Sequence, residues 1–259
     1  MEYIKHKCFS NGNVYLLNTD DGYPVEVTDT FLPYYTKECT GNNNFLNDDN
    51  LGTRNERWMI GVSTMSGCPV GCKFCATGKL NKCRNLTADE IVEQVKFILE
   101  KNHITPDDSK EFKINYTRMG EPFLNIDNVK EAIEFISFVY PNAHHYISTI
   151  GIKNADYSWI KGNITLQFSL HSFDEGYRNW LIPFKDKIKV KEMGLVKTES
   201  NLKTTLNMTM ARKEDFDISL MQEYFDKDNF FVKISPINEN DISISNDMGS
   251  GIIQQQNII

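Results

Sequence analysis

Three cysteines lie close together after a short apolar segment, and their type and spacing indicate metal chemistry. They are Cys68, Cys72 and Cys75, spaced C-x3-C-x2-C in a loop that also contains Gly and Pro. Soft thiolates gathered in this way bind zinc or an iron–sulfur cluster. Structural zinc takes four ligands, and no second Cys or Cys/His pair follows at zinc-finger spacing. The spacing therefore favours a 4Fe–4S cluster held by three cysteines, with one iron open to a ligand from outside the protein.

Cysteine usage in the rest of the chain does not indicate disulfides. Six cysteines in 259 residues are too few for a disulfide-stapled scaffold. Cys8, Cys39 and Cys83 have no partner at metal-ligand spacing, and we expect them to be small, partly buried thiols. The alternative for the three loop cysteines is a set of buried or zinc-bound thiols.

The cysteine loop follows the first of several short apolar segments that alternate with longer amphipathic ones. Helices are expected most clearly over about 88–101, where Thr87 and Glu90 form a capping-box pattern, and over about 127–140. Repeated strand–helix units with right-handed crossovers give a parallel sheet, either open or closed into a full or partial barrel. The functional residues of such folds lie at the carboxyl ends of the strands. The predicted strands are 57–63, 111–117, 144–149, 163–170, 203–210 and 230–236.

The chain outside these repeats consists of an N-terminal segment and a polar tail. Residues 13–17 and 25–28 are predicted strands on either side of the turn at 20–22, which is a hairpin pattern. Residues 40–55 are rich in Asn, Asp and Gly, as is typical of a surface loop. We therefore expect an N-terminal hairpin and polar loop at 1–56, a barrel at 57–240 and a polar C-terminal tail at 241–259.

Further motifs follow the cysteine loop in a fixed order along the chain. They are the segments 72–78, 84–91, 119–125 (Met-Gly-Glu-Pro-Phe-Leu-Asn), 148–151 (Ser-Thr-Ile-Gly), 169–171 (Ser-Leu-His) and 236–238 (Pro-Ile-Asn). In these motifs the chain resembles the radical S-adenosylmethionine (SAM) superfamily. Within it, the chain is most similar to the radical-SAM adenine methyltransferases of ribosomal and transfer RNA. The resemblance covers about residues 57–240.

The resemblance implies a fold, two cofactors and a set of binding residues. The fold is α/β, a partial (β/α)6 radical SAM barrel with a small N-terminal β-hairpin extension. Cys68, Cys72 and Cys75 would hold the 4Fe–4S cluster, whose open iron chelates SAM, and an electron donor such as flavodoxin or ferredoxin would reduce it. Acceptors for the SAM amino group and short polar side chains for its ribose are needed nearby. The residues implied are Gly120, Glu121, Ser148, Ser169, His171 and Asn238.

The chain departs from the methyltransferases at two cysteines. These enzymes use one thiol seven residues before the first cluster cysteine and a second near the C-terminus. Counting back from Cys68 gives Gly61, and no cysteine follows Cys83. Without a thiol to accept the methyl group and pass it on, the methyltransferase mechanism cannot operate, unless Cys39 or Cys83 takes the place of the missing cysteines. Glu26 is the counterpart of the family's proton-accepting glutamate, and the alternative is an exposed hairpin carboxylate.

The charge and hydropathy of the chain indicate which classes of partner, nucleic acid or membrane, the protein can bind. Lys and Arg number 28 and Asp and Glu 35, so the net charge is −7, which disfavours general nucleic-acid coating. Five lysines between 185 and 197 are a solvated face or, alternatively, contact phosphates on a nucleotide or short RNA. Since only 56 residues precede the expected barrel, we expect the family's RNA-binding domain to be absent or reduced. No apolar run or signal-peptide pattern indicates a membrane, so we expect a cytoplasmic protein.

These observations lead to one prediction of function and two alternatives. We expect a radical SAM enzyme that generates a 5′-deoxyadenosyl radical to modify an organic substrate, such as a small molecule. The resemblance suggests a nucleobase, a nucleotide or RNA as that substrate, with RNA disfavoured by the net charge. The first alternative is an RNA adenine methyltransferase with a variant route. The second is a non-catalytic iron–sulfur module that binds SAM or a nucleotide.

Overall fold

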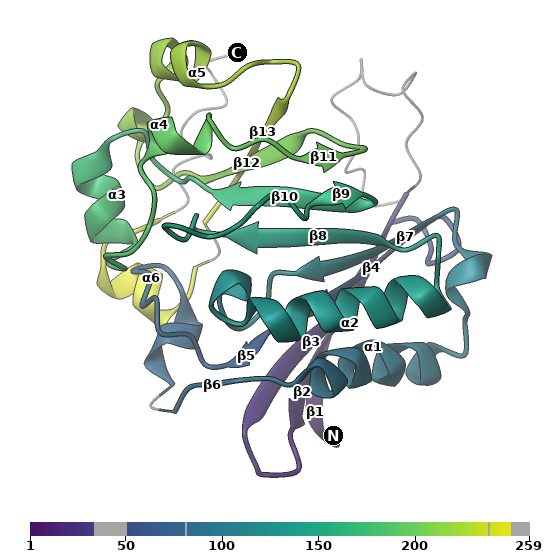
Figure 1. The fold of residues 1–259 in the computed structure, drawn as a ribbon. Coiled ribbons are helices and arrows are strands. Elements are labelled where there is room, and N and C mark those ends of the chain that lie inside the picture. The colour runs from purple at the N-terminus through teal and green to yellow at the C-terminus, as the bar shows by residue number, and fades with distance from the viewer. Residues whose placement is uncertain (34–50, 81, 238, 250–259) are drawn as a thin grey trace. The chain divides into compact units, whose positions relative to one another are not determined.

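The computed structural model describes residues 1–33, 51–80, 82–237 and 239–249. The chain forms two compact units, each built from several separate segments (Figure 1). Unit 1 contains Met1–Ser66, Asn85–Met119 and Asn125–Tyr146, and unit 2 contains Gly67–Arg84, Gly120–Leu124 and Ile147–Ile259. The three loop cysteines therefore belong to unit 2, and Glu26 and Gly61 belong to unit 1.

The main strands of unit 1 form both antiparallel and parallel pairs. β1 pairs with β2, β2 with β3, and β3 with β4 in antiparallel fashion, whereas β4 and β7 run parallel. In the β3–β4 pair Thr28 lies opposite Gly61. Across the sheet the order is β1 (Glu2–Phe9), β2 (Gly12–Asn18), β3 (Pro24–Leu32), β4 (Arg57–Val62) and β7 (Glu111–Tyr116).

Two helices, α1 (Ala88–Asn102) and α2 (Ile126–Val139), pack against each other in unit 1, and α1 also contacts β4 (Figure 1). The predicted capping box is present, because the Thr87 hydroxyl accepts from the Glu90 backbone N–H at 3.2 Å and the Glu90 carboxylate accepts from the Thr87 N–H at 2.8 Å. These bonds satisfy N–H groups that the first helical turn leaves without partners. The apolar side of α1 is buried, as its spacing predicts.

A buried carboxylate, Asp29, fixes β3 to β4 and to the segment before it. Its oxygens accept from the Trp58 indole N–H at 2.7 Å and from the Arg54 guanidinium at 2.6 and 3.1 Å. A buried charge is tolerated when it is paired and hydrogen-bonded in this way. The network therefore stabilises the part of unit 1 in which Glu26 and Gly61 lie.

Unit 2 contains a run of parallel strands. β10 (Ile164–Ser169) pairs with β12 (Thr204–Thr209), which pairs with β13 (Phe230–Ser235). β8 (His144–Thr149) begins in unit 1 and ends in unit 2. The helices of unit 2 are short: α3 (Glu175–Leu181), α4 (Val190–Met193), α5 (Ile218–Tyr224) and α6 (Asp241–Ser245).

Smaller elements connect these strands and helices. The short strands are β5 (Met65–Ser66), β6 (Arg84–Asn85), β9 (Lys161–Gly162) and β11 (Glu199–Ser200). The 3-10 helices are η2 (Ala76–Lys79), η3 (Pro106–Asp108), η4 (Pro122–Leu124) and η5 (Lys213–Asp215).

The parallel strands of unit 2 have one apolar and one polar face, because successive side chains of a strand point to opposite sides. The apolar face, with Leu166, Phe168, Leu206 and Met208, is fully buried. The opposite face carries Gln167, Ser169, Asn207 and Thr209, which are only partly buried. This polar face ends at the carboxyl ends of the strands, where the sequence places its binding motifs.

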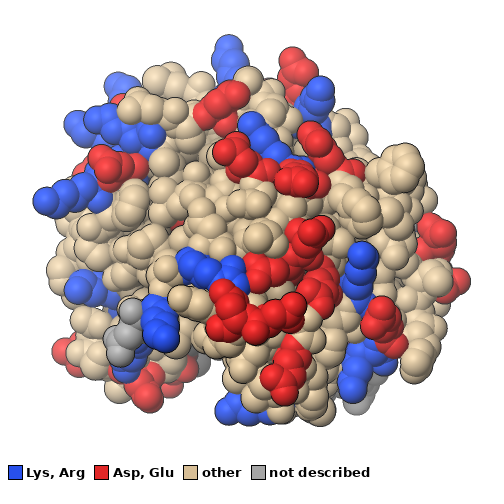
Figure 2. Space-filling view, turned by 60° about the horizontal axis from the view of Figure 1, so that its bottom comes forward, with Lys and Arg blue, Asp and Glu red and all other residues tan. Residues whose placement is uncertain are grey.

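All six predicted strands are present within one residue at each end, and the fold is α/β with parallel pairing between strands of the repeat. Residues 40–50 of the predicted polar loop lie outside the described residues. Among the helices that the structure describes, none is long and apolar enough to cross a membrane. Figure 2 shows acidic side chains gathered near the middle of one face, in keeping with the net charge of −7.

Candidate active site

The cysteine loop takes its shape from two glycines with left-handed backbone angles. Gly67 has φ 79° and Gly71 has φ 69°, a region that residues with a Cβ rarely adopt. A Cβ on Gly67 would also lie 2.5 Å from the carbonyl oxygen of Lys82, which is closer than any real contact. The loop therefore needs glycine at position 67 in order to fold back against the segment that follows it.

Three hydrogen bonds fasten the loop to distant parts of unit 2. The Lys73 N–H donates to the Leu181 carbonyl at 2.9 Å, at the end of α3. The side-chain amides of Asn240 and Asn246 donate to the carbonyls of Phe74 and Lys73 at 2.9 and 3.0 Å. The segment around α6, which the sequence predicts only as the start of a polar tail, thus positions the residues between the second and third cysteines.

The three thiols are partly buried and lie close enough to influence one another. Burial raises the pKa of Cys68 to about 12, and negative charge on Cys75 and Glu121 adds to the effect. Burial likewise raises the pKa of Cys72 well above its ordinary value. Thiols in this environment lose their protons only when a cation compensates, as cluster irons do.

The arrangement of the three thiols distinguishes a site for a single metal ion from a site for an iron–sulfur cluster. Within the described ranges no three Cys, His, Asp or Glu side chains converge on one point as ligands of a single ion. In a 4Fe–4S cubane each cysteine binds a different iron, so that such convergence is not required. Three soft donors on one glycine-shaped loop fit that cluster.

Glu121 is a buried carboxylate at the start of η4, and only 3% of the residue is exposed. Its oxygens accept from the backbone N–H groups of Phe123 and Ile150 at 3.1 and 2.9 Å. Burial raises its pKa to about 7, although these bonds and the Thr149 side chain oppose that rise. A carboxylate has more lone pairs than these bonds use, so a cationic ligand can still bind it.

Gly120, directly before this carboxylate, has φ 105°, which a residue with a Cβ rarely adopts. The strand-end motif therefore combines a special backbone position with a buried acceptor.

His171 lies just beyond the end of β10 and connects that strand end to the cysteine loop. Its Nδ1 accepts from the Thr209 N–H at 3.0 Å, and its ring meets the Phe74 ring edge-on at 5.0 Å between centroids. Burial, with the nearby charge of Arg178, lowers the pKa of His171 to about 3. The imidazole is therefore neutral, with its remaining hydrogen on Nε2 as a donor.

The two predicted serines lie on the strands themselves. The Ser148 hydroxyl donates to the Gln167 side-chain oxygen at 2.9 Å, and Asn207 donates to the same oxygen at 3.4 Å. Ser169 pairs with Asn207 in the β10–β12 register. Gln167 and Asn207 were not singled out from the sequence, although their alternation with apolar residues places them on the same face as Ser169.

Arg178 on α3 is a fully buried cation that the sequence analysis did not identify. Its guanidinium donates to the carbonyls of Ile150, Leu170 and Ile188 at 2.8, 3.2 and 3.0 Å. Two of these carbonyls directly follow β8 and β10. Arg178 therefore holds together the strand ends next to Glu121 and His171.

Two of the residues singled out from the sequence lie outside the part of the chain that the structure describes, and two cysteines are more exposed than predicted. Asn238 and Cys39 lie outside the described residues. Cys8 and Cys83 are exposed rather than partly buried, because β1 is solvent-exposed along its length and Cys83 lies on an open segment after η2. Within the polar lysine segment, Lys187 donates to Asn179 and to the Phe184 carbonyl, as a structural contact would.

In unit 1, Glu26 forms an ion pair with Arg118, the residue two positions before Gly120. The Arg118 side chain covers Gly61, the position at which the methyltransferases carry a cysteine: a Cβ there would lie 3.1 Å from Arg118 Cδ and 2.3 Å from the Thr28 hydroxyl oxygen. Both charged side chains are about a third exposed, 35% each.

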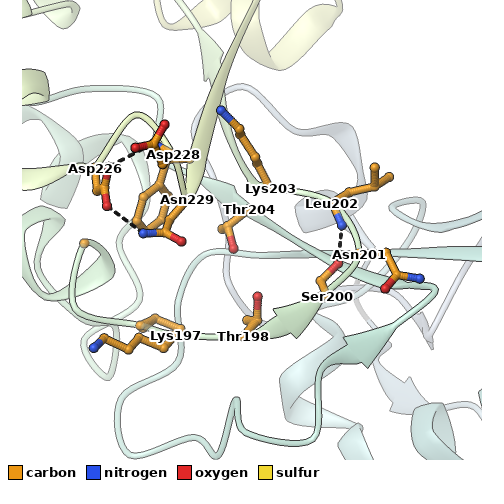
Figure 3. Close-up of a pocket in the computed structure, with 13 residues that line it drawn as sticks. Lys197, Thr198, Ser200, Asn201, Leu202, Lys203, Thr204, Asp226, Asp228 and Asn229 are labelled. Atoms are coloured by element: carbon orange, nitrogen blue, oxygen red, sulfur yellow. Dashed lines mark hydrogen bonds between the residues drawn. The ribbon is translucent and has the colours of Figure 1, made fainter.

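A separate cavity of about 640 Å³ lies in unit 2, at the amino ends of β12 and β13 (Figure 3). Its polar groups bond largely to one another: Asp226 accepts from Asn229 at 2.7 Å, and Lys203 donates to the Lys227 carbonyl at 2.7 Å. Since the predicted binding motifs lie at the carboxyl ends of the strands, this cavity is not the site that they form.

Curated relatives of this chain carry names from one group of enzymes. The probable dual-specificity RNA methyltransferase RlmN of Heliobacterium modesticaldum is 37% identical over 152 residues, covering 53% of this chain and 37% of that protein. The probable dual-specificity RNA methyltransferase RlmN of Pelodictyon phaeoclathratiforme is 33% identical over 208 residues, covering 74% and 57%. The chain spans about half the length of the curated relatives it matches.

A solved structure and a family model agree with these relatives. The crystal structure of a radical SAM methyltransferase from Sphaerobacter thermophilus superposes with a TM-score of 0.65 at 20% identity, over 92% of this chain and 67% of that one, which supports the fold. The family model of the Radical SAM superfamily matches residues 62–217. Because this match covers more than half of the chain and includes the three cysteines, the protein belongs to the radical SAM superfamily, whose members use a 4Fe–4S cluster and SAM.

Proposed function

We propose that this protein is a radical SAM enzyme that uses SAM chiefly as a radical source to modify an organic substrate of the nucleotide or nucleobase class. The observation that carries the proposal is the proximity, within unit 2, of three partly buried thiols and the buried carboxylate of Glu121. We further propose that residues 57–240 form the partial barrel expected from the sequence.

Each residue of the site has a role that follows from its contacts. Cys68, Cys72 and Cys75 would hold the cluster. Glu121, already oriented by two backbone N–H groups, would accept from the SAM amino group. The neutral His171 would offer its Nε2 hydrogen to a SAM oxygen, because its Nδ1 is occupied by Thr209.

The polar face of β8 and β10 offers further groups for the same ligand. The hydroxyls of Ser148 and Ser169, with Gln167 and Asn207 beside them, can donate to and accept from a ribose. The cluster held by these three cysteines would supply the electron for reductive cleavage of the SAM C–S bond, with methionine and a 5′-deoxyadenosyl radical as products, and the substrate would donate a hydrogen atom to that radical. An external electron donor of the flavodoxin or ferredoxin type would supply that electron.

The surroundings of Gly61 support a reaction without methyl transfer. Position 61 has no side chain, and the Arg118 stem fills the adjoining space. The thiol that acts on the RNA adduct in the methyltransferases therefore has no counterpart at position 61.

The experiment is anaerobic incubation of reconstituted protein with a strong reductant and methyl-labelled SAM. The expected products are 5′-deoxyadenosine and methionine, with the label retained in methionine. Chromatography of the small molecules and mass spectrometry of the protein would detect both. Label on a cysteine of the protein would contradict the proposal.

The second candidate is an RNA adenine methyltransferase, which the names of the relatives favour. It requires a variant route in which another thiol or acceptor takes the place of the family's two cysteines. Transfer of label to adenine in added RNA would establish it. A third outcome, in which cluster and SAM bind but no 5′-deoxyadenosine forms after reduction, would indicate a binding module.

A further inference from the structure

Arg118 projects from a backbone segment that is firmly attached to the end of β4 in unit 1. Its N–H donates to the Val62 carbonyl at 3.1 Å, and the Met119 N–H donates to the Ser63 hydroxyl at 3.1 Å. The Met119 carbonyl accepts from the Thr64 N–H at 2.8 Å. The base of the Arg118 side chain is thus held in place at the carboxyl ends of two parallel strands, β4 and β7.

The Arg118 stem lies against Gly61, where the chain has no side chain. A Cβ at this position would lie 2.3 Å from the Thr28 hydroxyl oxygen and 3.1 and 3.3 Å from Cδ and Cγ of Arg118. The contact with Thr28 would force a change, whereas the arginine stem would need to shift only slightly. Glycine at position 61 therefore leaves room for both the Thr28 hydroxyl and the Arg118 stem.

The guanidinium keeps most of its hydrogen-bonding capacity. Among the described residues, the guanidinium has one hydrogen-bond partner, Glu26 Oε1, which is bonded to Nη2; a guanidinium has five N–H donors. Across the described parts of the chain, no other side chain pairs with Arg118. About a third of the Arg118 side chain and a third of the Glu26 side chain are exposed to solvent.

We propose that Arg118 binds a phosphate group of the substrate and that Glu26 is the internal anion which holds the guanidinium until the phosphate arrives. A guanidinium donates two parallel N–H bonds to phosphate oxygens, so a group with spare donors on a fixed base suits this ligand. The net charge of −7 repels anions at long range, so that binding depends on such a local cation.

The choice of a nucleotide phosphate rests on the proposed function, whereas the anion site itself rests on Arg118, Glu26 and Gly61. Two sources of phosphate share this chemistry. A nucleotide monophosphate offers a phosphomonoester, and an RNA strand offers phosphodiesters.

Isothermal titration calorimetry tests the proposal on the reconstituted, oxidised full chain saturated with SAM. Adenosine 5′-monophosphate is compared with adenosine at low ionic strength, so that the ratio of their dissociation constants reports the phosphate alone. We expect the monophosphate to bind about tenfold more tightly or better, since charge-assisted contacts are of that size. Arg118→Gln should bring the ratio close to one.

Glu26→Gln provides the decisive arm, because it removes the competing carboxylate and should tighten monophosphate binding by several-fold. A gain in affinity cannot come from misfolding. Arg212→Gln is the matched control, since Arg212 is 36% exposed and is also ion-paired, with Asp215. It should leave the ratio unchanged.

An unchanged ratio in Arg118→Gln, or a weaker monophosphate affinity in Glu26→Gln, would overturn the proposal. A short oligoadenylate whose binding depends on Arg118 while the monophosphate does not bind would support the phosphate site and assign RNA as its source. No reduction is used, so a protein that binds phosphate but does not cleave SAM would refute only the proposed function.

Discussion

Replacing Glu121 by Gln removes a single buried charge and changes little else in shape. The carboxylate is 3% exposed and already accepts two backbone N–H bonds, so its position should survive the substitution. A charge-assisted contact to the SAM amino group contributes on the order of 1.5–3 kcal/mol. The dissociation constant for SAM should therefore rise by roughly 10- to 100-fold.

The pH dependence of SAM binding is a second test of the placement of Glu121 in the SAM site. Burial raises the pKa of Glu121 to about 7. Below that pH the carboxyl is protonated in the free protein and must ionise before it can pair with a cation. SAM affinity of the parent protein should therefore fall about tenfold per pH unit as the pH drops below 7, whereas Glu121→Gln should show no such slope.

The stability of the protein without SAM and cluster should change in the opposite sense. The folded pKa of about 7 lies above the unfolded value of 4.5, so folding takes up a proton between these values. The contribution of Glu121 to the free energy of unfolding is complete below pH 4.5 and is lost as the pH rises to about 7. The loss amounts to roughly 3 kcal/mol and is absent in Glu121→Gln.

Two measurements at several pH values test these predictions. Calorimetric titration with SAM gives the dissociation constant, and urea unfolding gives the free energy of unfolding. Asp226→Asn is a control, since Asp226 lies at the amino ends of the strands. Equal SAM affinity and equal pH slopes in the parent and in Glu121→Gln would refute the placement of Glu121 in the SAM site.

Four further predictions concern the cluster loop, Arg178, His171 and the surroundings of Gly61. Replacing any one of the three loop cysteines by Ala should abolish most of the bound iron and visible absorbance, and full iron content in all three variants would exclude them as ligands. Arg178→Met removes the guanidinium donor of the buried Ile150 and Ile188 carbonyls, whereas the Leu170 carbonyl still accepts from the Ser172 N–H. It should lower the free energy of unfolding in urea by roughly 3–5 kcal/mol, with Arg178→Lys recovering part; an unaffected Arg178→Met would contradict this. Burial lowers the pKa of His171 to about 3, so the parent loses stability as the pH falls below 6.5. His171→Asn should weaken that loss in acid unfolding, and an unchanged profile would argue against a buried neutral ring. Gly61→Cys should destabilise the protein, because its Cβ would lie 2.3 Å from the Thr28 hydroxyl oxygen, and adding Thr28→Ala should restore stability by more than about 0.5 kcal/mol; strictly additive effects would contradict this contact.

Much of the scaffold could be predicted from local patterns. Strands such as β7 and β10 are short apolar runs, and the capping box at Thr87 and Glu90 is visible within four residues of sequence. The motif residues at the strand ends could be named because their order matches a known family. Local sequence and family order therefore gave the helix boundary, the strand positions and Glu121.

The supporting contacts could not be predicted, because each joins residues far apart in the chain. Asn240 reaches the loop carbonyl of Phe74 across 166 positions. Arg178 carries no motif, and only the folded strand ends reveal its three carbonyl partners. Arg118 pairs with Glu26 across 92 positions, and its stem lies against residue 61, which has no side chain.

The most direct test of the central claim is the amount of 5′-deoxyadenosine formed after one round of reduction. Anaerobic, reconstituted protein is mixed with SAM and a strong reductant, and the nucleoside is quantified by chromatography against the cluster content. We expect 5′-deoxyadenosine from the parent protein and none above background from Cys72→Ala. A parent protein that holds a full cluster and binds SAM, yet forms no 5′-deoxyadenosine on reduction, would contradict it.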